Sequence, residues 1–385
     1  MFNNIKNKFL FISVTLIIVL TGCNEVKEQY NPSSDNLRFA GEKHFRNIKQ
    51  LTFGGNNAEA YWSFDSKQLV FQSDWDKINS QGCDQIYVMN ADGSQLKNGE
   101  QYKLVSTGKG RTTCSYFLKG DEKIVYASTH EADENCPETP MFVNGKYVWP
   151  IYKTYNIYTA NTDGTNQEKL ISSDSYDAEA TVSPDGKYII FTSTRTGDLE
   201  LWRYEISTGD ILQLTDKLGY DGGAFFSNDS KKIVWRASRP TGEAAEEYKK
   251  LLNDGLVEPT ALNIFIADID GKNVVQVTDL PGANWAPFFH PTDKKILFCS
   301  NHHSMDNGGR LFDIFMIDID GKNKEQITNS GTFDAFPMFS FDGKKIAFAS
   351  NRQADGKPTR ATNVFVADWI ENPEEVDINF EPSKK

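Results

Sequence analysis

The chain has 385 residues, of which 39% are hydrophobic and 12% aromatic, and its formal net charge at pH 7 is −12. This apolar content can fill a large interior and excludes a globally disordered chain. The excess of carboxylates repels phosphate groups, so we expect neither a nucleic-acid partner nor electrostatic attachment to an anionic membrane surface.

Residues 1–22 have the pattern of a bacterial secretory signal. Lys6 and Lys8 precede an apolar run, Phe9–Leu20, that is short for a membrane span. The run ends in Leu20-Thr21-Gly22-Cys23, which resembles a lipobox with Cys23 as the lipidated first residue of the mature protein. A plain signal peptide followed by an accidental cysteine is the alternative. We therefore expect a lipid-anchored protein of the bacterial cell envelope, placed at the outer membrane and facing the periplasm or the exterior.

From residue 44 to residue 369 the chain repeats one unit six times. In the clearest copy, the strand Ala178–Val182 is followed by the turn Ser183-Pro184-Asp185-Gly186-Lys187 and by a second strand, Tyr188–Ser193. The branched residue after the turn recurs at Leu69, Ile124, Ile189, Ile233, Ile296 and Ile346. Each copy continues with a second hairpin. Six copies of four antiparallel strands predict an all-β fold, a six-bladed β-propeller.

The two ends of the repeat array complete each other. The last copy has a third strand, Val364–Asp368, and no fourth. The stretch Arg46–Thr52 matches the fourth strands of the other copies, so we expect this N-terminal strand to close the ring and hide the sheet edges. Residues 23–43 are expected to form a tether, and residues 370–385 an acidic tail.

The repeats resemble those of TolB-type propellers. The resemblance lies in the Ser-Pro-Asp-Gly-Lys turn, the Thr192-Ser193-Thr194-Arg195 stretch after it and the Asp-Gly hairpins, and it covers residues 44–369. Related blades form the gating domain of prolyl-oligopeptidase-like enzymes. The resemblance implies the fold and leaves the activity open, since one fold hosts many functions. The chain contains no Gly-x-Ser-x-Gly nucleophile elbow of the kind those peptidases use.

Strand order predicts that one face of the propeller carries the long loops. The links from second to third strands lie on the same face as the links between blades, and all long insertions fall on such links: Trp75–Asp84, His130–Tyr155, Arg239–Leu262, His302–Asp313 and Arg352–Asn363. We call this side the decorated face. Function tends to reside in loops on a rigid scaffold, so we expect the ligand there. Residues 242–255 within one insertion have a helical pattern.

Aligning the copies places polar residues at the channel mouth, where each inner strand begins on the decorated face. The first position holds Asn57, Thr112, Asp177, Asp221, Asn284 and Asp334. Two residues further on stand Glu59, Cys114, Glu179, Gly223, Ala286 and Phe336. The carboxylates of Asp177, Asp221 and Asp334 could jointly bind a hard cation such as Ca²⁺. The alternative is that each one caps its own turn. The polar residues of both positions, Asn57, Glu59, Thr112, Glu179 and Asn284, complete the expected ligand face.

Histidines add to this face. His130 and His302 occupy the aligned column that elsewhere holds Arg195, Arg239 and Arg352. The resemblance to TolB-type repeats, in which that arginine packs against neighbouring backbone, favours a structural role for the column. His303 lies outside it and is the better candidate for a metal ligand.

Export permits disulfides, and the four remaining cysteines allow three complete pairings. The propeller fold puts the loops that carry Cys83 and Cys136 in adjacent blades, so we expect a Cys83–Cys136 disulfide. Cys114, on the same face, is the rival partner for either residue. Cys299 falls in an inner strand and is expected to remain a buried thiol.

Two functions are compatible with the sequence. The first is a binding or assembly module that holds a protein, peptide or glycan on the decorated face. The second is a metal-assisted hydrolase or lyase with its site at the channel mouth, motivated by the His, Asp and Glu residues gathered there.

Overall fold

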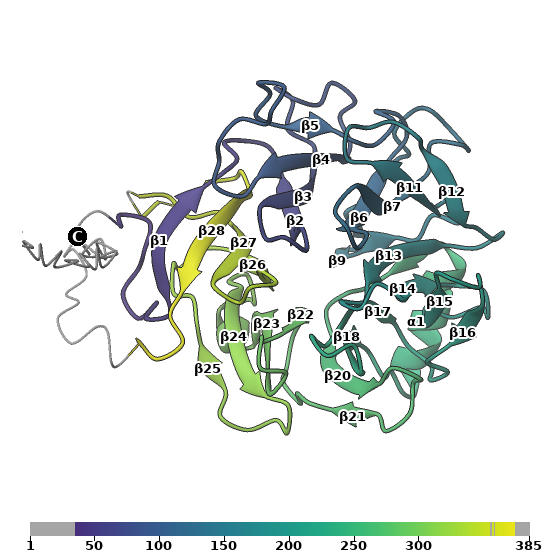
Figure 1. Cartoon of the computed structure of the whole chain (residues 1–385). Coiled ribbons are helices and arrows are strands. Elements are labelled where there is room, and N and C mark those ends of the chain that lie inside the picture. The colour runs from purple at the N-terminus through teal and green to yellow at the C-terminus, as the bar shows by residue number, and fades with distance from the viewer. Residues whose placement is uncertain (1–34, 355, 358, 374–385) are drawn as a thin grey trace, which may run out of the picture.

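Six four-stranded antiparallel sheets are arranged in a ring in the computed structural model, which describes residues 35–354, 356–357 and 359–373 (Figure 1). The predicted all-β fold, a six-bladed β-propeller, is confirmed. The expected signal peptide, Cys23 and most of the acidic tail lie outside the described residues.

The strands of each blade follow chain order from the inside of the ring outward, except in blade 6, where the N-terminal strand is outermost. Blade 1 contains β2 (Asn57–Trp62), β3 (Gln68–Ser73), β4 (Gln85–Asn90) and β5 (Lys103–Leu104). Blade 2 contains β6 (Thr112–Phe117), β7 (Lys123–Ser128), β11 (Asn156–Asn161) and β12 (Glu168–Ile171). Blade 3 contains β13 (Asp177–Val182), β14 (Tyr188–Ser193), β15 (Glu200–Glu205) and β16 (Ile211–Gln213).

Blades 4 to 6 follow the same plan. Blade 4 contains β17 (Asp221–Phe226), β18 (Lys232–Ala237), β20 (Asn263–Asp268) and β21 (Val275–Gln276). Blade 5 contains β22 (Asn284–Phe289), β23 (Lys295–Ser300), β24 (Asp313–Asp318) and β25 (Glu325–Gln326). Blade 6 contains β26 (Asp334–Phe339), β27 (Lys345–Ser350) and β28 (Asn363–Trp369), with β1 (Phe45–Gln50) as its outer strand.

The strand β1 closes the ring as predicted. It pairs antiparallel with β28, from Phe45 opposite Trp369 to Gln50 opposite Phe365. The expected tether, however, ends earlier than residue 43, because the described residues before β1 pack on blade 6. Glu42 is fully buried there in an ion pair with Arg352.

The repeated turn is held by its own side chains. In blade 3 the Ser183 hydroxyl donates to Asp185 at 2.7 Å and accepts from the backbone N–H groups of Lys187 and Tyr188 at 3.2 and 3.0 Å. The bond from the serine hydroxyl to the aspartate recurs at Ser63, Ser227 and Ser340. These local bonds explain why Ser-x-Asp marks most copies in the sequence.

Every inner strand has an irregularity at its third residue. The pairing with the second strand shifts in register there in all six blades. The third residues all have positive φ: Glu59, Cys114, Glu179, Gly223, Ala286 and Phe336. Only one of the six is glycine, so five side chains stand in a backbone conformation that costs about 1–3 kcal/mol and usually marks a functional position.

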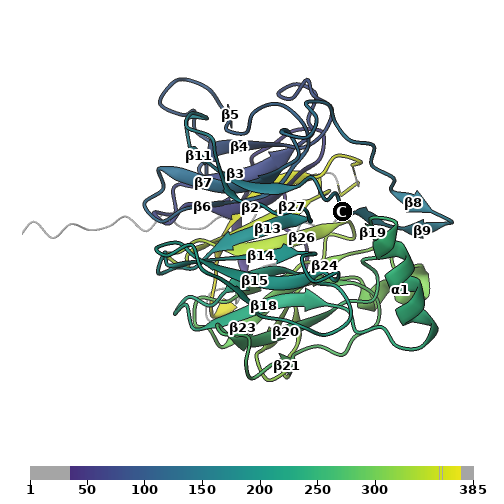
Figure 2. The ribbon, with the colours of Figure 1, turned by 90° about the vertical axis from the view of Figure 1, so that its right-hand side faces the viewer.

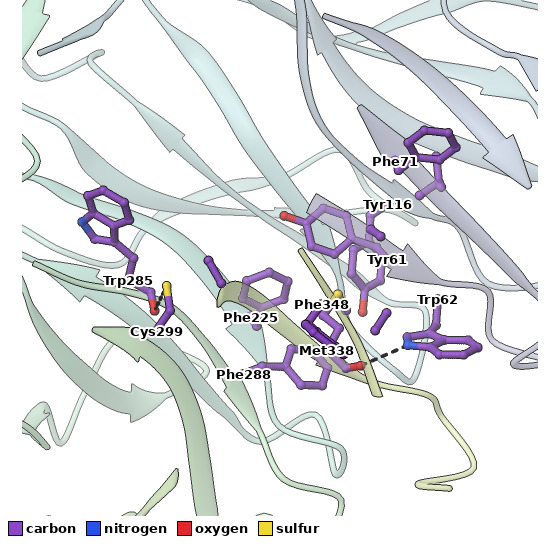
Figure 3. Close-up of a cluster of buried hydrophobic side chains, with 14 of the residues drawn as sticks. Tyr61, Trp62, Phe71, Tyr116, Phe225, Trp285, Phe288, Cys299, Met338 and Phe348 are labelled. Atoms are coloured by element: carbon purple, nitrogen blue, oxygen red, sulfur yellow. Dashed lines mark hydrogen bonds between the residues drawn. The ribbon is translucent and has the colours of Figure 1, made fainter. Parts of the chain in front are cut away.

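The fifth residues of the inner strands fill the centre of the ring. Those of blades 1, 2, 4 and 5 are aromatic, and Figure 3 shows them converging. Tyr61 lies 5.6 Å from Tyr116 and 5.7 Å from Phe225 between ring centroids, and Phe225 lies 5.3 Å from Phe288. All four are buried. We call this set the central plug. It separates the mouth on the decorated face from the opposite face.

The insertions form further structure on the decorated face. They include the hairpin β8–β9 (Phe142–Val143 and Lys146–Tyr147), α1 (Glu243–Asn253) and the 3-10 helix η2 (His302–Asn307). Two short strands, β10 (Trp149–Pro150) and β19 (Leu256–Val257), pair with each other. Figure 2 shows α1, β8, β9 and β19 together on one side of the ring. Within the described residues, no helix is both long and apolar enough to cross a bilayer.

Candidate functional site

The first residues of the inner strands do not form a shared cation site. Asp177, Asp221 and Asp334 are fully buried, and each is ion-paired with the arginine of its own blade. Within the described part of the chain, no group of three or more His, Cys, Asp and Glu residues is placed to hold a metal ion. The expected Ca²⁺ ring at these three residues is therefore wrong, because each carboxylate already has a guanidinium neighbour.

The alternative, in which each aspartate caps its own turn, describes only part of these bonds. Asp334 accepts from Ser330 at 2.6 Å, four residues before it, and also from Arg352 at 3.0 Å. Asp177 does the same with Ser173 at 2.7 Å and Arg195 at 3.1 Å. We call this combination of aspartate and arginine the blade clasp. It joins the start of the inner strand to the end of the second strand.

Blades 1, 2 and 5 have a neutral version of the clasp. Asn57 accepts from Ser73 at 2.7 Å, and Asn284 accepts from Ser300 at 2.6 Å. Thr112 donates to the Asp84 carbonyl at 2.8 Å.

The two aligned histidines take part in this neutral version of the clasp. Nδ1 of His302 lies 2.8 Å from the Ser300 hydroxyl, and Nδ1 of His130 lies 2.8 Å from the Ser128 hydroxyl. Both histidines thus stand where the arginines stand in the other blades. This geometry fits the structural role that the alignment favoured.

His303 is already engaged by a carboxylate. Its Nε2 lies 2.9 Å from Oδ2 of Asp313, and its ring lies 5.3 Å from that of Phe315. Burial lowers the pKa of His303, and burial together with the nearby Asp334 raises the pKa of Asp313 to about 7. The pair is two-membered and not the metal ligand set that the sequence led us to expect.

A different group occupies the mouth above the central plug. Glu179 of blade 3 is ion-paired with Arg236 of blade 4. It also accepts from the Tyr220 hydroxyl at 2.7 Å, the Thr192 hydroxyl at 2.6 Å and the Gly223 N–H at 2.9 Å. Burial alone would raise the pKa of Glu179, but Arg236 and the hydrogen bonds outweigh it and lower that pKa. Glu179 therefore holds a full negative charge that is matched by one guanidinium.

The approach of Arg236 to Glu179 depends on two glycines. A Cβ at Gly223 would lie 1.6 Å from Nη1 of Arg236, and one at Gly222 would lie 2.4 Å from Oε2 of Glu179. Neither gap admits a side chain, so the Gly222-Gly223 pair leaves the space that the ion pair fills.

Glu59, the equivalent of Glu179 in blade 1, has no arginine beside it. Its Oε2 is buried and has no hydrogen-bond partner among the described residues. Burial raises the pKa of Glu59 from 4.5 to about 7, although a hydrogen bond with the Cys114 thiol acts in the opposite direction. Near neutral pH this carboxyl can hold or release a proton, which Glu179 cannot.

The insertions of blades 2 and 4 form a cap over the mouth. Pairing of β10 with β19 joins the two insertions across blade 3. From β10, the Trp149 ring lies 5.3 Å from the Arg236 guanidinium and 5.2 Å from the Trp285 ring of blade 5. Trp285 in turn donates its indole N–H to the Pro259 carbonyl at 2.9 Å. The Arg236 guanidinium thus lies against the rings of Trp149 and Tyr220, and Trp285 packs on the first of these rings.

Cys83 of blade 1 and Cys136 of the blade 2 insertion form a disulfide with a Cα–Cα distance of 5.9 Å, the pair preferred from the sequence. Cys299 is a buried free thiol, and Cys114 is also free and faces Glu59. The disulfide fixes the start of the insertion that carries Trp149.

Beyond the cap, the hairpin β8–β9 carries large apolar side chains in contact with solvent. Met141 is 58% exposed and Phe142 66% exposed. An open pocket of about 430 Å³ lies nearby between the two insertions. Its lining includes Pro140, Tyr152 and Leu256.

The sequence interpretation singled out Glu59 and Glu179 but missed Arg236 and Trp149. A signal for Arg236 exists in the alignment. The fifth residue of the second strand is small or neutral in five blades: Gln72, Ala127, Thr192, Cys299 and Ala349. In blade 4 this position holds Arg236, opposite the Gly222-Gly223 pair.

Comparison with known proteins places the chain among propellers. Residues 256–360 match the family model of the TolB beta propeller domain, PD40. The chain is 26% identical over 144 residues to an uncharacterized protein of Agrobacterium fabrum, a match that covers 35% of this chain and 45% of the relative. It is 25% identical over 190 residues to the Tol-Pal system protein TolB of Francisella tularensis, a match that covers 42% of this chain and 43% of that protein.

These matches span less than half the length of either curated relative. A solved structure, a putative TolB from Agrobacterium tumefaciens, has the same fold, with a TM-score of 0.51 at 17% identity over 84% of this chain and 97% of that one. The chain is therefore a six-bladed β-propeller whose repeats are similar to those of TolB-type propellers.

Proposed function

We propose that this protein is a binding or assembly module of the bacterial envelope that holds a partner protein on its decorated face. One observation carries the proposal: the hairpin β8–β9 presents Met141 and Phe142 to solvent, 58% and 66% exposed. Large neighbouring apolar side chains exposed on a projecting element are typical of surfaces that bind protein.

The base of this hairpin is braced. Lys146 forms ion pairs with Glu247 at 2.7 Å and with Glu258 at 3.2 Å, both in the blade 4 insertion. The Val148 N–H donates to the Met141 carbonyl at 3.0 Å. Each surface ion pair is worth little alone, but together with the β10–β19 pairing they fix the hairpin relative to two blades. An apolar surface that is already fixed loses little conformational entropy on binding.

The proposed location follows from the N-terminal sequence. A signal-like segment with Cys23 after it supports export and lipid anchoring at the outer membrane. The similarity of the propeller to TolB of the Tol-Pal system supports an envelope setting. A peptide and a glycan are the alternative ligands for the same decorated face. The exposed Met and Phe side chains favour protein over glycan.

The test is site-specific photocrosslinking in intact cells. A photoreactive amino acid at position 142 should give a discrete adduct with an envelope protein, and the Met141→Ser substitution beside it should weaken that adduct. The matched control is position 275 on β21, where Val275 is 47% exposed but lies in an outer strand. Equal adducts from positions 142 and 275, or none from position 142, would contradict the proposal.

A further inference from the structure

Arg352 of blade 6 is bound by a glutamate side chain from the segment of the chain that precedes β1. Nη1 and Nη2 of Arg352 donate to the two carboxylate oxygens of Glu42 at 3.1 and 2.9 Å. Nη1 also donates to the Leu37 carbonyl at 3.1 Å. The Phe39 ring lies over the guanidinium, 5.6 Å from its centre. The chain before β1 therefore occupies a forked binding site on the decorated face.

The bound segment is a tight turn in which the glutamate side chain is already oriented. The N–H of Phe39 donates to Oε2 of Glu42 at 2.9 Å, and the N–H of Glu42 donates to the Phe39 carbonyl at 3.2 Å. Because this turn sets the aromatic ring and the carboxylate side by side, both meet the same guanidinium.

Blade 3 has the same arginine without a bound segment. Nε of Arg195 donates to Asp177 and to Ser193, each at 3.2 Å, and Nη2 donates to both carboxylate oxygens of Asp177 at 3.1 Å. Arg352 uses its Nε and Nη2 in the same way on its own blade, at 3.1 Å from Ser350 and 3.0 Å from Asp334.

The two arginines differ at the edge that Glu42 occupies and in the second ring near the guanidinium, which is Trp202 at 5.7 Å for Arg195 and Phe39 at 5.6 Å for Arg352. Nη1 of Arg195 has no hydrogen-bond partner among the residues that the structure describes. The Arg195 side chain is 18% exposed, whereas that of Arg352 is completely buried. The ring beneath is also matched, since Phe191 lies 5.1 Å below Arg195 as Phe348 lies 4.8 Å below Arg352.

The link that carries Arg195 is short. The link from β14 to β15, Thr194–Leu199, has six residues, and blade 3 carries none of the long insertions of the other five blades. Blade 4 offers no second copy of the site. Both Nη atoms of Arg239 are taken, with Nη1 at 2.9 Å from Asp221 and 2.6 Å from the Ser238 carbonyl, and Nη2 at 2.7 Å from Asp221.

We propose that Arg195 is a docking site for an acidic peptide segment of a partner protein. The segment presents a glutamate in a tight turn, with an aromatic residue three positions before it, as Glu42 and Phe39 do on blade 6. The protein is acidic overall, so recognition comes from the forked hydrogen bonds and ring stacking at short range and not from a long-range field. This site goes beyond the proposed function at the β8–β9 hairpin and does not depend on it.

The probe is the peptide with the sequence of Asp35–Lys43, blocked at both ends and fluorescently labelled, titrated into the full mature chain. The tethered copy of this segment keeps Arg352 occupied through its high effective concentration. We expect saturable binding that a Glu42→Gln change in the peptide weakens at least about tenfold, because a charge-assisted fork is lost. Arg195→Lys in the protein should weaken binding to a similar extent, since lysine cannot form the fork.

Arg239→Lys is the matched control and should leave the affinity unchanged. The peptide variant tests the contact without altering the protein, so a folding defect in Arg195→Lys does not obscure the result. Absence of binding at millimolar peptide, or equal affinity of the wild-type chain and Arg195→Lys, overturns the proposal. The proposal is also overturned if Arg352→Lys abolishes binding and Arg195→Lys does not. The peptide would then be exchanging with the tethered segment at Arg352. A hairpin variant, Phe142→Ser, should bind the peptide normally, and this separates failure here from failure of the proposed function.

Discussion

Blades 1 and 3 share one backbone plan and hold charge in opposite ways. The inner strand of blade 3 begins with Asp177, paired with Arg195, and its third residue, Glu179, is paired with Arg236. The inner strand of blade 1 begins with Asn57, which accepts from a serine, and its third residue, Glu59, forms no ion pair among the described residues, although Arg236 is close enough to lower its pKa slightly. The same positions therefore carry either matched ion pairs or neutral hydrogen bonds.

The comparison extends to all six blades and shows that the clasp residues occur in matched sets. Where the inner strand begins with aspartate, in blades 3, 4 and 6, the second residue after the second strand is arginine. Where it begins with asparagine or threonine, that residue is Trp75, His130 or His302. A buried carboxylate without a cation is costly, so the two positions constrain each other within one chain.

The largest effect should come from breaking the ion pair above the central plug. Arg236→Ala leaves Glu179 buried with no cation and removes the ring contacts with Trp149 and Tyr220. We expect a loss of about 3–5 kcal/mol in the free energy of unfolding, measured by chemical denaturation.

Arg203→Ala is the control for this change. Arg203 also lies over a tyrosine ring, that of Tyr188 at 4.4 Å, but among the described residues it donates only to the Ile269 carbonyl. It should lose less than about 1 kcal/mol. Similar losses in the two variants would mean that ring contacts, and not the buried charge pair, dominate at Arg236.

A smaller effect should follow from converting the clasp of blade 3 into that of blade 5. Asp177→Asn alone leaves Arg195 without its anion and should lower the free energy of unfolding by roughly 2–3 kcal/mol. Adding Arg195→His recreates the arrangement of Asn284, Ser300 and His302, and should restore most of the loss. Additive losses in this double-mutant cycle would show that the two positions are independent.

The features predicted correctly from the sequence are those that the repeat imposes. Six copies in register determine which residues begin each inner strand, which strand must close the ring and which links can carry insertions. The Cys83–Cys136 disulfide follows from the same geometry, because adjacent blades bring the loops together. The expected cation site at Asp177 was wrong, because the aligned arginines, which were expected to pack against neighbouring backbone, pair with the aspartates instead.

Other features depend on contacts between segments that do not repeat. The pairing of β10 with β19 joins two insertions that have no counterpart in the other blades. The docking of Glu42 on Arg352 joins an apparently polar tether to the last blade. Neither contact has a periodic signal, because each is made once and between residues far apart in the chain.

The smallest expected effect concerns the unpaired glutamate of blade 1 and appears in its pH dependence. The pKa of Glu59 is raised by burial from 4.5 to about 7, so between these values the folded protein keeps a proton that the unfolded chain has lost. Stability contributed by the protonated carboxyl is therefore complete below about pH 4.5 and is lost as the pH rises through 7. Glu59→Gln removes this loss, so the variant should be more stable than the wild type at pH 8 and should not differ from it at pH 4.

Glu179→Gln should behave in the opposite sense and sharpens the comparison between the two blades. The pKa of Glu179 is lowered in the folded protein, so its ionised form stabilises the fold above its ordinary pKa and that contribution is lost as the pH falls. The glutamine variant should therefore be less stable than the wild type at pH 8 and approach it in acid. Chemical denaturation of the three proteins from pH 4 to pH 8 measures both differences against the same background of other titrating groups. Parallel curves for Glu59→Gln and Glu179→Gln would mean that the two glutamates share one electrostatic environment, contrary to the pairing of Arg236 with Glu179 alone.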